Sequence, residues 1–281
     1  MLKIVVDGSA DMPADWPERY QFDILPMPIQ IGNRTYYQGE DISPEKFYQL
    51  VEVTENHPQT AAPSPSRIAK FIEEVTEIGD TVLSINVSGK MSSTVAMVQK
   101  AEKILIEKVK MVVFDSEAGS AVLAFMAREA RLREQAGESL EQILEVLTKI
   151  RDQVMVVLTL DTLDFARRSG RVGSIKAALT SILKIKPIIS LQSGLLDISD
   201  MVRSRKKSLT RLVNKVQERF GTQEIKVAIV HAQDSETADI LKEMVTNVAN
   251  TTEVIFTELS ISVAANLGPG TVGIVALPEN I

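Results

Sequence analysis

The stretch TVLSINVSGKMSSTVAMVQKAEKILI, residues 81–106, decides the fold class. Residues 81–87 form an apolar run of strand length, and residues 94–106 have the apolar spacing that is typical of a helix. A short turn rich in hydroxyl side chains joins the two segments. A strand that passes through a tight turn into a helix is the basic unit of an α/β fold.

Apolar runs of strand length alternate with segments of helical period along most of the chain, which predicts an α/β fold with largely parallel or mixed sheets. A length of 281 residues exceeds the usual span of one compact domain. We therefore expect two α/β domains, residues 1–155 and 156–281, with an approximate boundary and segments that exchange between them. The predicted strands are residues 3–6, 24–31, 81–87, 110–114, 154–160, 187–191, 225–230, 253–259 and 273–277.

Several helices are marked by their end signals. Ser43 and Ser64 each precede a proline, which is the pattern of an N-cap followed by proline at the first helical position. A helix that begins near Ala121 is expected to stop at Gly137, because glycine is the usual residue just beyond a helix. A further helix is predicted for residues 140–154.

The composition excludes several kinds of chemistry. The chain has no cysteine, so it has no disulfide, thiol nucleophile or thiolate metal site. Its two histidines, His57 and His231, with no HExxH spacing, argue against a histidine-based zinc site. A formal net charge of −6 opposes a general affinity for nucleic acid. No apolar run approaches the roughly 18 to 20 residues of a membrane-spanning helix, and residues 1–13 lack a signal-peptide pattern, so we expect a cytoplasmic protein that is not processed.

Two short sequences match nucleotide-binding motifs in letters but not in context. GPGTVG, residues 268–273, fits GxGxxG, yet dinucleotide-binding glycines follow a strand and open a helix, whereas these precede an apolar run. SINVSGKM, residues 84–91, lacks both the first glycine and the final hydroxyl residue of a P-loop. A GxSxG elbow is absent as well. The sequence therefore predicts neither an ATP-binding loop nor an ordinary hydrolase site.

The turn after residues 81–87 is the first candidate binding site. Its hydroxyl residues are Ser88, Ser92, Ser93 and Thr94. They lie at a predicted helix start, where free backbone N–H groups suit an anion, although the simpler interpretation is that one of them is an N-cap. Thr60 in a proline-rich loop and the glycine turn NLGPG at residues 266–270 are weaker candidates, because such residues usually serve only the backbone.

Positive charge is concentrated in one part of the chain. Between Arg167 and Lys207 there are ten basic residues, against the acidic residues Asp197 and Asp200. This stretch either binds a phosphate or an acidic protein, or is a solvated loop end, and the sequence favours neither interpretation.

Eight segments, in this order, resemble the DegV family, whose members include the fatty-acid-binding FakB subunits of bacterial fatty acid kinase. The segments are IVVDGSADMP, LPMPIQIGNRTYYQGEDISPEKFY, QTAAPSPS, VSGKMSST, FDSEAGSAVLAF, LDFARRSGRVG, LKIKPIISLQSG with a following VRSRKK, and NLGPGTVGI. Together they span essentially the whole chain. The resemblance implies a DegV-like pair of α/β domains, a bound fatty acid as ligand, no cofactor or metal, and no catalytic centre of its own.

The resemblance also implies which residues bind the ligand. In the family, a threonine of the TxxPS loop and a serine of the SGT turn hold the fatty acid carboxylate, and these residues correspond here to Thr60 and Ser92. Ser93 follows Ser92 in the same turn, and Asn266 lies in the NLGPG turn, which corresponds to an HTGPG turn near the carboxylate in the family. Asn266 stands where family members commonly have histidine, so it can donate a hydrogen bond but carries no positive charge. Ser93 replaces a usual glycine, and Gly8 replaces a usual serine.

We therefore expect a bacterial protein that binds a long-chain fatty acid such as palmitate and presents its carboxylate to the ATP-binding subunit of a fatty acid kinase, which forms an acyl phosphate. Peripheral contact with a membrane would serve lipid exchange. The residues expected to contact the kinase are Arg167, Arg168, Arg171, Arg203 and Arg205. Two alternatives stay open, namely an enzyme subunit acting on a small carbonyl or sugar, as in relatives of dihydroxyacetone kinase, and a regulatory interaction protein.

Overall fold

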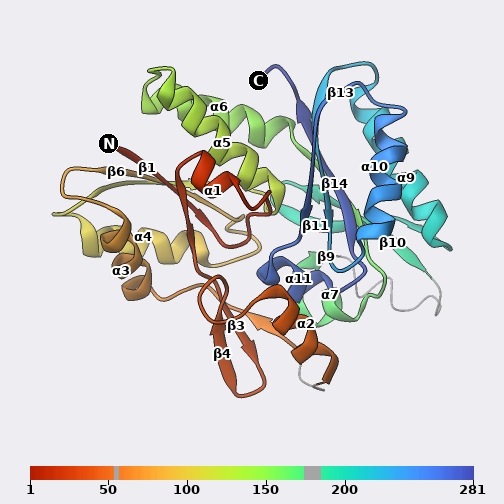
Figure 1. Cartoon of the computed structure of the whole chain (residues 1–281), viewed down its shortest axis with the longest axis horizontal. Coiled ribbons are helices and arrows are strands. Elements are labelled where there is room, and N and C mark those ends of the chain that lie inside the picture. The colour runs from red at the N-terminus through yellow and green to blue at the C-terminus, as the bar shows by residue number, and fades with distance from the viewer. Residues whose placement is uncertain (54–56, 174–184) are drawn as a thin grey trace. The chain divides into compact units, whose positions relative to one another are not determined.

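The computed structural model describes residues 1–53, 57–173 and 185–281. The chain divides into two compact units (Figure 1). Unit 1 comprises Met1–Arg151 with Ser260–Ser262, and unit 2 comprises Asp152–Leu259 with Val263–Ile281. The division into two domains, residues 1–155 and 156–281, stays a prediction. The sequence also predicts an amphipathic helix after Gly173. That segment, with Lys176 and Lys184 of the basic stretch, lies outside the described residues.

A parallel sheet forms the centre of unit 1. Its strands lie in the order β2-β1-β6-β7, and every neighbouring pair is parallel. Continuous apolar runs such as IVV and VLSI suit strands that are covered on both faces. The strands are β1 (Leu2–Asp7), β2 (Phe22–Leu25), β6 (Thr81–Asn86) and β7 (Lys110–Asp115).

Helices cover both faces of this sheet (Figure 1). On one face, α3 (Pro65–Val75) and α4 (Thr94–Leu105) pack together over a core that includes Ile72 and Val98. On the other face, α5 (Ala121–Gln135) runs along β1 and is buried on all sides over its first two turns. The remaining helices of unit 1 are α1 (Trp16–Arg19), α2 (Pro44–Val53) and α6 (Leu140–Gln153).

The predicted helix ends are confirmed where they can be compared. The Ser64 hydroxyl accepts a hydrogen bond from the Arg67 N–H at 3.3 Å, and the Ser43 hydroxyl accepts one from the Lys46 N–H at 3.3 Å. Gly137, just beyond α5, has a φ of +84°. These local signals worked because capping depends on residues only a few positions apart.

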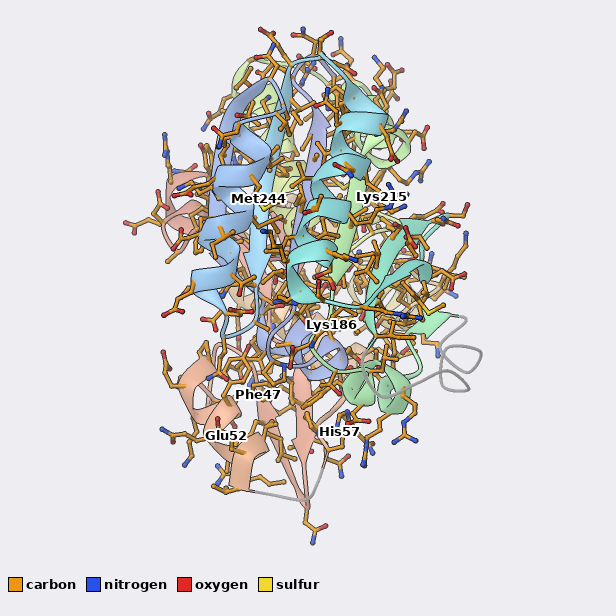
Figure 2. All side chains as sticks on the ribbon, turned by 90° about the vertical axis from the view of Figure 1, so that its right-hand side faces the viewer. Phe47, Glu52, His57, Lys186, Lys215 and Met244 are labelled. Atoms are coloured by element: carbon orange, nitrogen blue, oxygen red, sulfur yellow. The ribbon has the colours of Figure 1, made fainter. Side chains whose placement is uncertain are left out.

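A small antiparallel sheet in the order β4-β3-β5 follows β2. The single strand expected at residues 24–31 is wrong, because the chain forms β2 and then β3 (Pro28–Ile31). Pro26, which has no N–H for a ladder, lies at the break. The partners of β3 are β4 (Arg34–Tyr37) and β5 (Gln59–Thr60). Figure 2 labels Phe47 and Glu52 on α2, where Phe47 is buried.

Unit 2 contains a mixed sheet in the order β13-β12-β14-β8-β10-β11-β9, in which β12–β13 and β9–β11 are the parallel pairs. Two long helices, α9 (Arg205–Phe220) and α10 (Ser235–Thr246), lie side by side against the sheet, as the labels Lys215 and Met244 show (Figure 2). The strands are β8 (Met155–Thr159), β9 (Val172–Gly173), β10 (Lys186–Gln192), β11 (Leu195–Val202), β12 (Ile225–His231), β13 (Thr251–Glu258) and β14 (Val272–Pro278). The short helices are α7 (Asp164–Ser169) and α11 (Ile261–Leu267).

The sequence prediction missed β11, which forms a hairpin with β10. Ser193 and Gly194 both have positive φ angles, of 47° and 79°, which is the geometry of a tight hairpin turn. The dipeptide Ser-Gly between two strand-like runs was a signal that could have revealed the hairpin.

Within the described ranges, the structure contains no helix with the length and apolar character needed to cross a bilayer.

Candidate functional site

The order of the strands in unit 1 marks one edge of the sheet as a binding position. From β1 the chain moves to β2 on one side, and from β6 it moves to β7 on the other. The loops after β1 and β6 therefore diverge at the carboxyl ends of these strands. In open α/β sheets this switch point is where ligands bind.

Ser92 lies in the turn that follows β6 at this edge. Its hydroxyl oxygen accepts a hydrogen bond from the Thr94 N–H at 3.2 Å and lies 2.8 Å from the Thr94 hydroxyl. Ser92 is half-buried, whereas Ser93 is exposed and its side chain makes no capping bond. Ser93 therefore occupies the N-cap position of α4 without a side-chain bond, and Ser92, one residue earlier, bonds to the first N–H of the helix. When Thr94 donates to it, the Ser92 O–H is available for an acceptor such as a carboxylate.

Thr60 is the second predicted ligand. It lies in β5, where it is opposite Ile29 of β3, so it belongs to a strand and not to a loop as the sequence suggested. The Ala61 N–H donates to the Pro28 carbonyl at 3.2 Å and continues this pairing. Since β3 begins three residues after β2 ends, the small sheet that holds Thr60 follows the carboxyl end of β2. Both predicted hydroxyls therefore follow carboxyl ends of the same parallel sheet.

The sequence analysis missed Asp7, a buried carboxylate at the switch point. One carboxylate oxygen accepts from the Ser9 N–H at 2.9 Å and from the Ser9 hydroxyl, and the other accepts from the Val87 N–H at 2.6 Å. Burial raises the pKa of Asp7, against the lowering effect of these hydrogen bonds. Asp7 thus ties the loop after β1 to the end of β6.

Asp11 makes a comparable link over a much longer distance in sequence. Its carboxylate accepts from the Ser260 N–H at 2.6 Å and from the Ser120 hydroxyl. Nearby, Gln38 accepts from the Ser262 N–H at 2.9 Å. Burial raises the pKa of Asp11 to about 6, and the negative charge of Asp7 adds to the effect, while the bonds from Ser120 and Ser260 oppose it.

Replacing Asp11 with asparagine should change how stability depends on pH. A carboxyl group whose pKa is higher in the folded protein binds more protons there than in the unfolded chain, so it stabilises the fold at low pH. The free energy of unfolding should fall as the pH rises from about 4 to about 6, and the shift from 3.8 to about 6 corresponds to about 3 kcal/mol. Asp11→Asn has no carboxyl group to ionise at this position, so it should be more stable than the native protein at pH 7 by about 1 to 3 kcal/mol.

Urea unfolding at pH 4 and pH 7 measures this effect. The amide oxygen of asparagine can still accept the Ser260 N–H. Asp15→Asn, which changes an exposed carboxylate, is the matched control. Equal stability differences at both pH values would contradict the role given to Asp11.

In unit 2, Asn266 lies in the last turn of α11 and is half-buried. Gly268 and Gly270 follow it with φ angles of +88° and +76°, which glycine adopts without strain. A Cβ atom at Gly268 would lie 2.7 Å from the Phe165 ring, and one at Gly270 would lie 2.6 Å from the Asp161 Cβ. The glycines of the NLGPG turn therefore allow the backbone to pass close to other segments of the chain itself.

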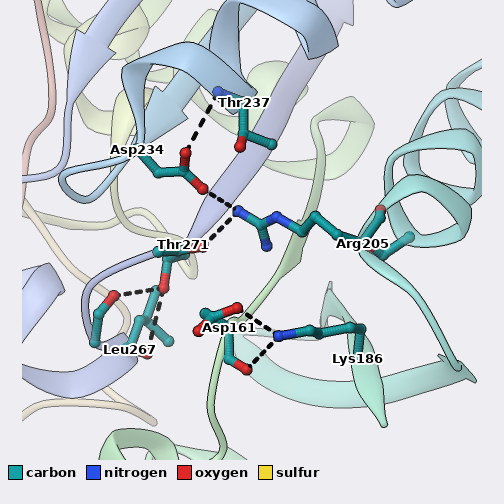
Figure 3. Close-up of polar contacts among 10 residues, drawn as sticks. Asp161, Lys186, Arg205, Asp234, Thr237, Leu267 and Thr271 are labelled. Atoms are coloured by element: carbon teal, nitrogen blue, oxygen red, sulfur yellow. Dashed lines mark hydrogen bonds and ion pairs between the residues drawn. The ribbon is translucent and has the colours of Figure 1, made fainter. Parts of the chain in front are cut away.

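The five predicted arginines fall into two groups. Arg167 and Arg168 on α7, and Arg203 before α9, are exposed. Arg171 and Arg205 are half-buried and bond to their own chain: Arg171 donates to the Ser169 carbonyl, and Arg205 donates to Asp234 and to the Gly270 carbonyl (Figure 3). Of these five arginines, only Arg167, Arg168 and Arg203 present their charge to solvent.

Two further polar contacts beside this turn were not predicted. Lys186 donates to the carbonyl of Asp161 at 2.8 Å and to its carboxylate (Figure 3). Asp161 follows directly on a predicted strand, which was a usable signal, but nothing in the sequence paired it with Lys186. Among the residues that the structure describes, no group of three or more His, Asp or Glu side chains is placed to hold a metal ion.

The geometry defines a class of protein: two α/β units, with a hydroxyl-bearing turn at the switch point of the first and a clamped glycine turn in the second. A family model described as "Uncharacterised protein, DegV family" matches residues 1–279. The chain belongs to the DegV family.

Similar proteins agree with this assignment. The chain is 25% identical to Protein DegV of Bacillus subtilis, over 97% of this chain and 98% of that protein, and 26% identical to a DegV domain-containing protein of Listeria innocua, over 97% of each. A DegV family protein from Thermus thermophilus, whose structure is described as showing fatty acid binding, is 28% identical and superimposes with a TM-score of 0.90 over 99% of both chains. The structure of DegV from Bacillus subtilis has a TM-score of 0.85 at 23% identity over 99% of both chains, which shows the shared fold.

Proposed function

We propose that this protein binds a long-chain fatty acid such as palmitate and presents its carboxylate to a separate ATP-dependent kinase, which forms the acyl phosphate. The observation that carries the proposal is the likeness to the Thermus thermophilus protein, which extends over 99% of both chains and whose structure is described as showing fatty acid binding. The position of Ser92 at a switch point supports it. The proposal includes a cytoplasmic location and a peripheral membrane contact for lipid exchange.

The apolar chain of the ligand supplies the affinity in this proposal. Burying about 14 methylenes of palmitate is worth about 11 kcal/mol, before association costs of about 4 to 15 kcal/mol. A hydrogen bond from a hydroxyl to a carboxylate adds about 1.5 to 3 kcal/mol. Thr60 and Ser92 therefore act mainly by fixing the direction of the head group, and Ser93 and Asn266 are assigned to it by the family resemblance.

Native mass spectrometry of the purified protein tests the ligand class. A bound mass equal to that of a long-chain fatty acid, displaced by added isotope-labelled palmitate, is the expected result. A small polar adduct would instead favour an enzyme subunit acting on a carbonyl or sugar. A protein that carries no ligand and does not bind added palmitate would favour a regulatory protein.

The environment of His231 argues against the carbonyl alternative. Such an enzyme needs an accessible histidine to capture the carbonyl, but the His231 side chain is buried against the Phe256 ring, with ring centres 5.0 Å apart. Burial also lowers the pKa of His231, with nearby acidic groups opposing the shift.

Charge reversal at Arg167 and Arg168 should slow phosphorylation without weakening fatty acid binding. Both side chains are exposed on α7, where opposite charge on a kinase would speed association. We expect Arg167→Glu with Arg168→Glu to lower the rate of kinase-dependent acyl phosphate formation about tenfold or more at low salt, with a smaller effect at high salt.

The control for this pair is Arg219→Glu, which reverses an exposed charge in the last turn of α9, a different helix. It should leave the phosphorylation rate within about twofold of the native value. An unchanged rate in the double variant would remove these arginines from the kinase surface.

A further inference from the structure

The Gly268–Gly270 turn is held by hydrogen bonds to the main chain of Gly270. One terminal nitrogen of Arg205, Nη2, donates to the Gly270 carbonyl at 2.6 Å (Figure 3). The Gly270 N–H donates to the Ala232 carbonyl at 2.7 Å. Both polar main-chain groups of Gly270 are therefore bonded within unit 2, and one of these bonds comes from a charged donor.

The guanidinium of Arg205 is itself fixed in place. The same nitrogen donates to Asp234 at 2.6 Å, and Asp234 caps α10 by accepting from the Thr237 N–H at 3.3 Å. Burial alone would raise the pKa of Asp234, but the bonds from Thr237 and Arg205 hold it below its usual value. Asp234 is thus ionised at neutral pH, and the ion pair joins the first turn of α9 to the first turn of α10.

The opposite side of the turn is held by packing. Phe165 fills the space beside Gly268, and Asp161 fills the space beside Gly270, which is why no side chain fits at either glycine. Lys186 in turn holds the Asp161 main chain and carboxylate. The segment that leads into α7 therefore packs on the same turn that Arg205 clamps.

Arg205 faces inward, unlike its neighbour Arg203. Its side chain is 23% exposed. Its second terminal nitrogen, Nη1, is buried, has no hydrogen-bond partner among the described residues, and is directed toward the Asp161–Lys186 pair (Figure 3). The terminal nitrogens of this guanidinium are either bonded within unit 2 or buried, so its role lies inside the molecule.

We propose that Arg205 is a positioning residue: by clamping the Gly270 carbonyl to the Asp234 carboxylate, it fixes the turn that follows Asn266 and thereby the direction of the Asn266 side chain. The link to a fatty acid head group rests on the proposed function. The clamp itself does not.

Hydrogen exchange by NMR on the full-length protein tests the clamp without any ligand. Arg205→Met, which keeps an unbranched apolar stem and removes the donors, should speed exchange of the Gly270 N–H about tenfold or more, since charge-assisted hydrogen bonds are the strong ones. Arg205→Lys should restore exchange to within about threefold of the native rate, because an ammonium can donate to both oxygens. Arg203→Met is the matched control and should change nothing at Gly270.

A second measurement adds palmitate and follows the side-chain amide signals of Asn266. In the native protein and in Arg203→Met, palmitate should shift these signals, whereas in Arg205→Met the shift should be lost although native mass spectrometry still detects bound palmitate. Should Arg205→Met not fold, Asp234→Asn takes its place, because asparagine still caps α10 but carries no charge for Arg205.

The proposal would be overturned if the Gly270 N–H exchanged at the native rate in Arg205→Met or in Asp234→Asn. It would also be overturned if palmitate shifted the Asn266 signals in Arg205→Met as it does in the native protein. If palmitate binds none of the proteins, the proposed function fails, while the exchange rates at Gly270 still decide whether Arg205 holds the turn.

Discussion

Replacing Thr60 and Ser92 together with alanine is expected to abolish palmitate retention or its phosphorylation. Each hydroxyl would contribute about 1.5 to 3 kcal/mol through a hydrogen bond to the carboxylate, so loss of both should weaken binding of the correctly oriented ligand by about 100-fold or more. Competition with labelled palmitate and the rate of acyl phosphate formation measure the two effects separately. A misdirected acid could remain bound by its apolar chain, but it would not be phosphorylated.

Two controls separate binding from folding in this experiment. Ser92→Ala also removes the bond to the Thr94 N–H, which should cost about 1 kcal/mol of stability because the first N–H of α4 loses its side-chain acceptor. Ser139→Ala removes the hydrogen bond from the Gln142 N–H at the start of α6 and touches no predicted ligand, so it should lose similar stability and bind palmitate like the native protein. Full activity of the Thr60→Ala, Ser92→Ala protein would show that the two residues are not the head-group ligands.

Gly270→Ala should be among the most destabilising single changes in unit 2. The new Cβ would lie 2.6 Å from the Asp161 Cβ, and the φ of +76° is unfavourable for any residue with a side chain. We expect a loss of about 2 to 4 kcal/mol in the free energy of unfolding, from backbone strain and overpacking together. Urea unfolding monitored by circular dichroism measures it.

Gly137→Ala is the matched control for this substitution. Gly137 has a similar φ of +84°, but a Cβ there would meet no atom within 4 Å. It should therefore show only the backbone cost, about 1 kcal/mol. Equal losses in the two variants would mean that Asp161 moves aside freely and does not hold the turn.

The sequence predicted the elements with local signals well. The strand–turn–helix unit formed by β6 and α4, the serine caps at Ser43 and Ser64, and the stop of α5 before Gly137 all depend on residues within a few positions of one another. The single strand proposed at residues 24–31 failed, because an apolar run was weighted above the interruption at Pro26. The hairpin strand β11 was missed because its turn signal was not used.

Some features of the candidate site could likewise be predicted from the sequence, and others could not. By itself the sequence determined the α/β class, the absence of thiol chemistry, the family, and the hydroxyls at the start of α4, because residue types and local periodicity carry that information. Only the tertiary structure decided that Asp11 binds the main chain of Ser260, 249 positions away, and that Arg205 is an internal clamp while Arg203 is exposed. The physical reason is that a charged side chain reveals its charge in the sequence, whereas its partner and its exposure depend on how distant segments pack.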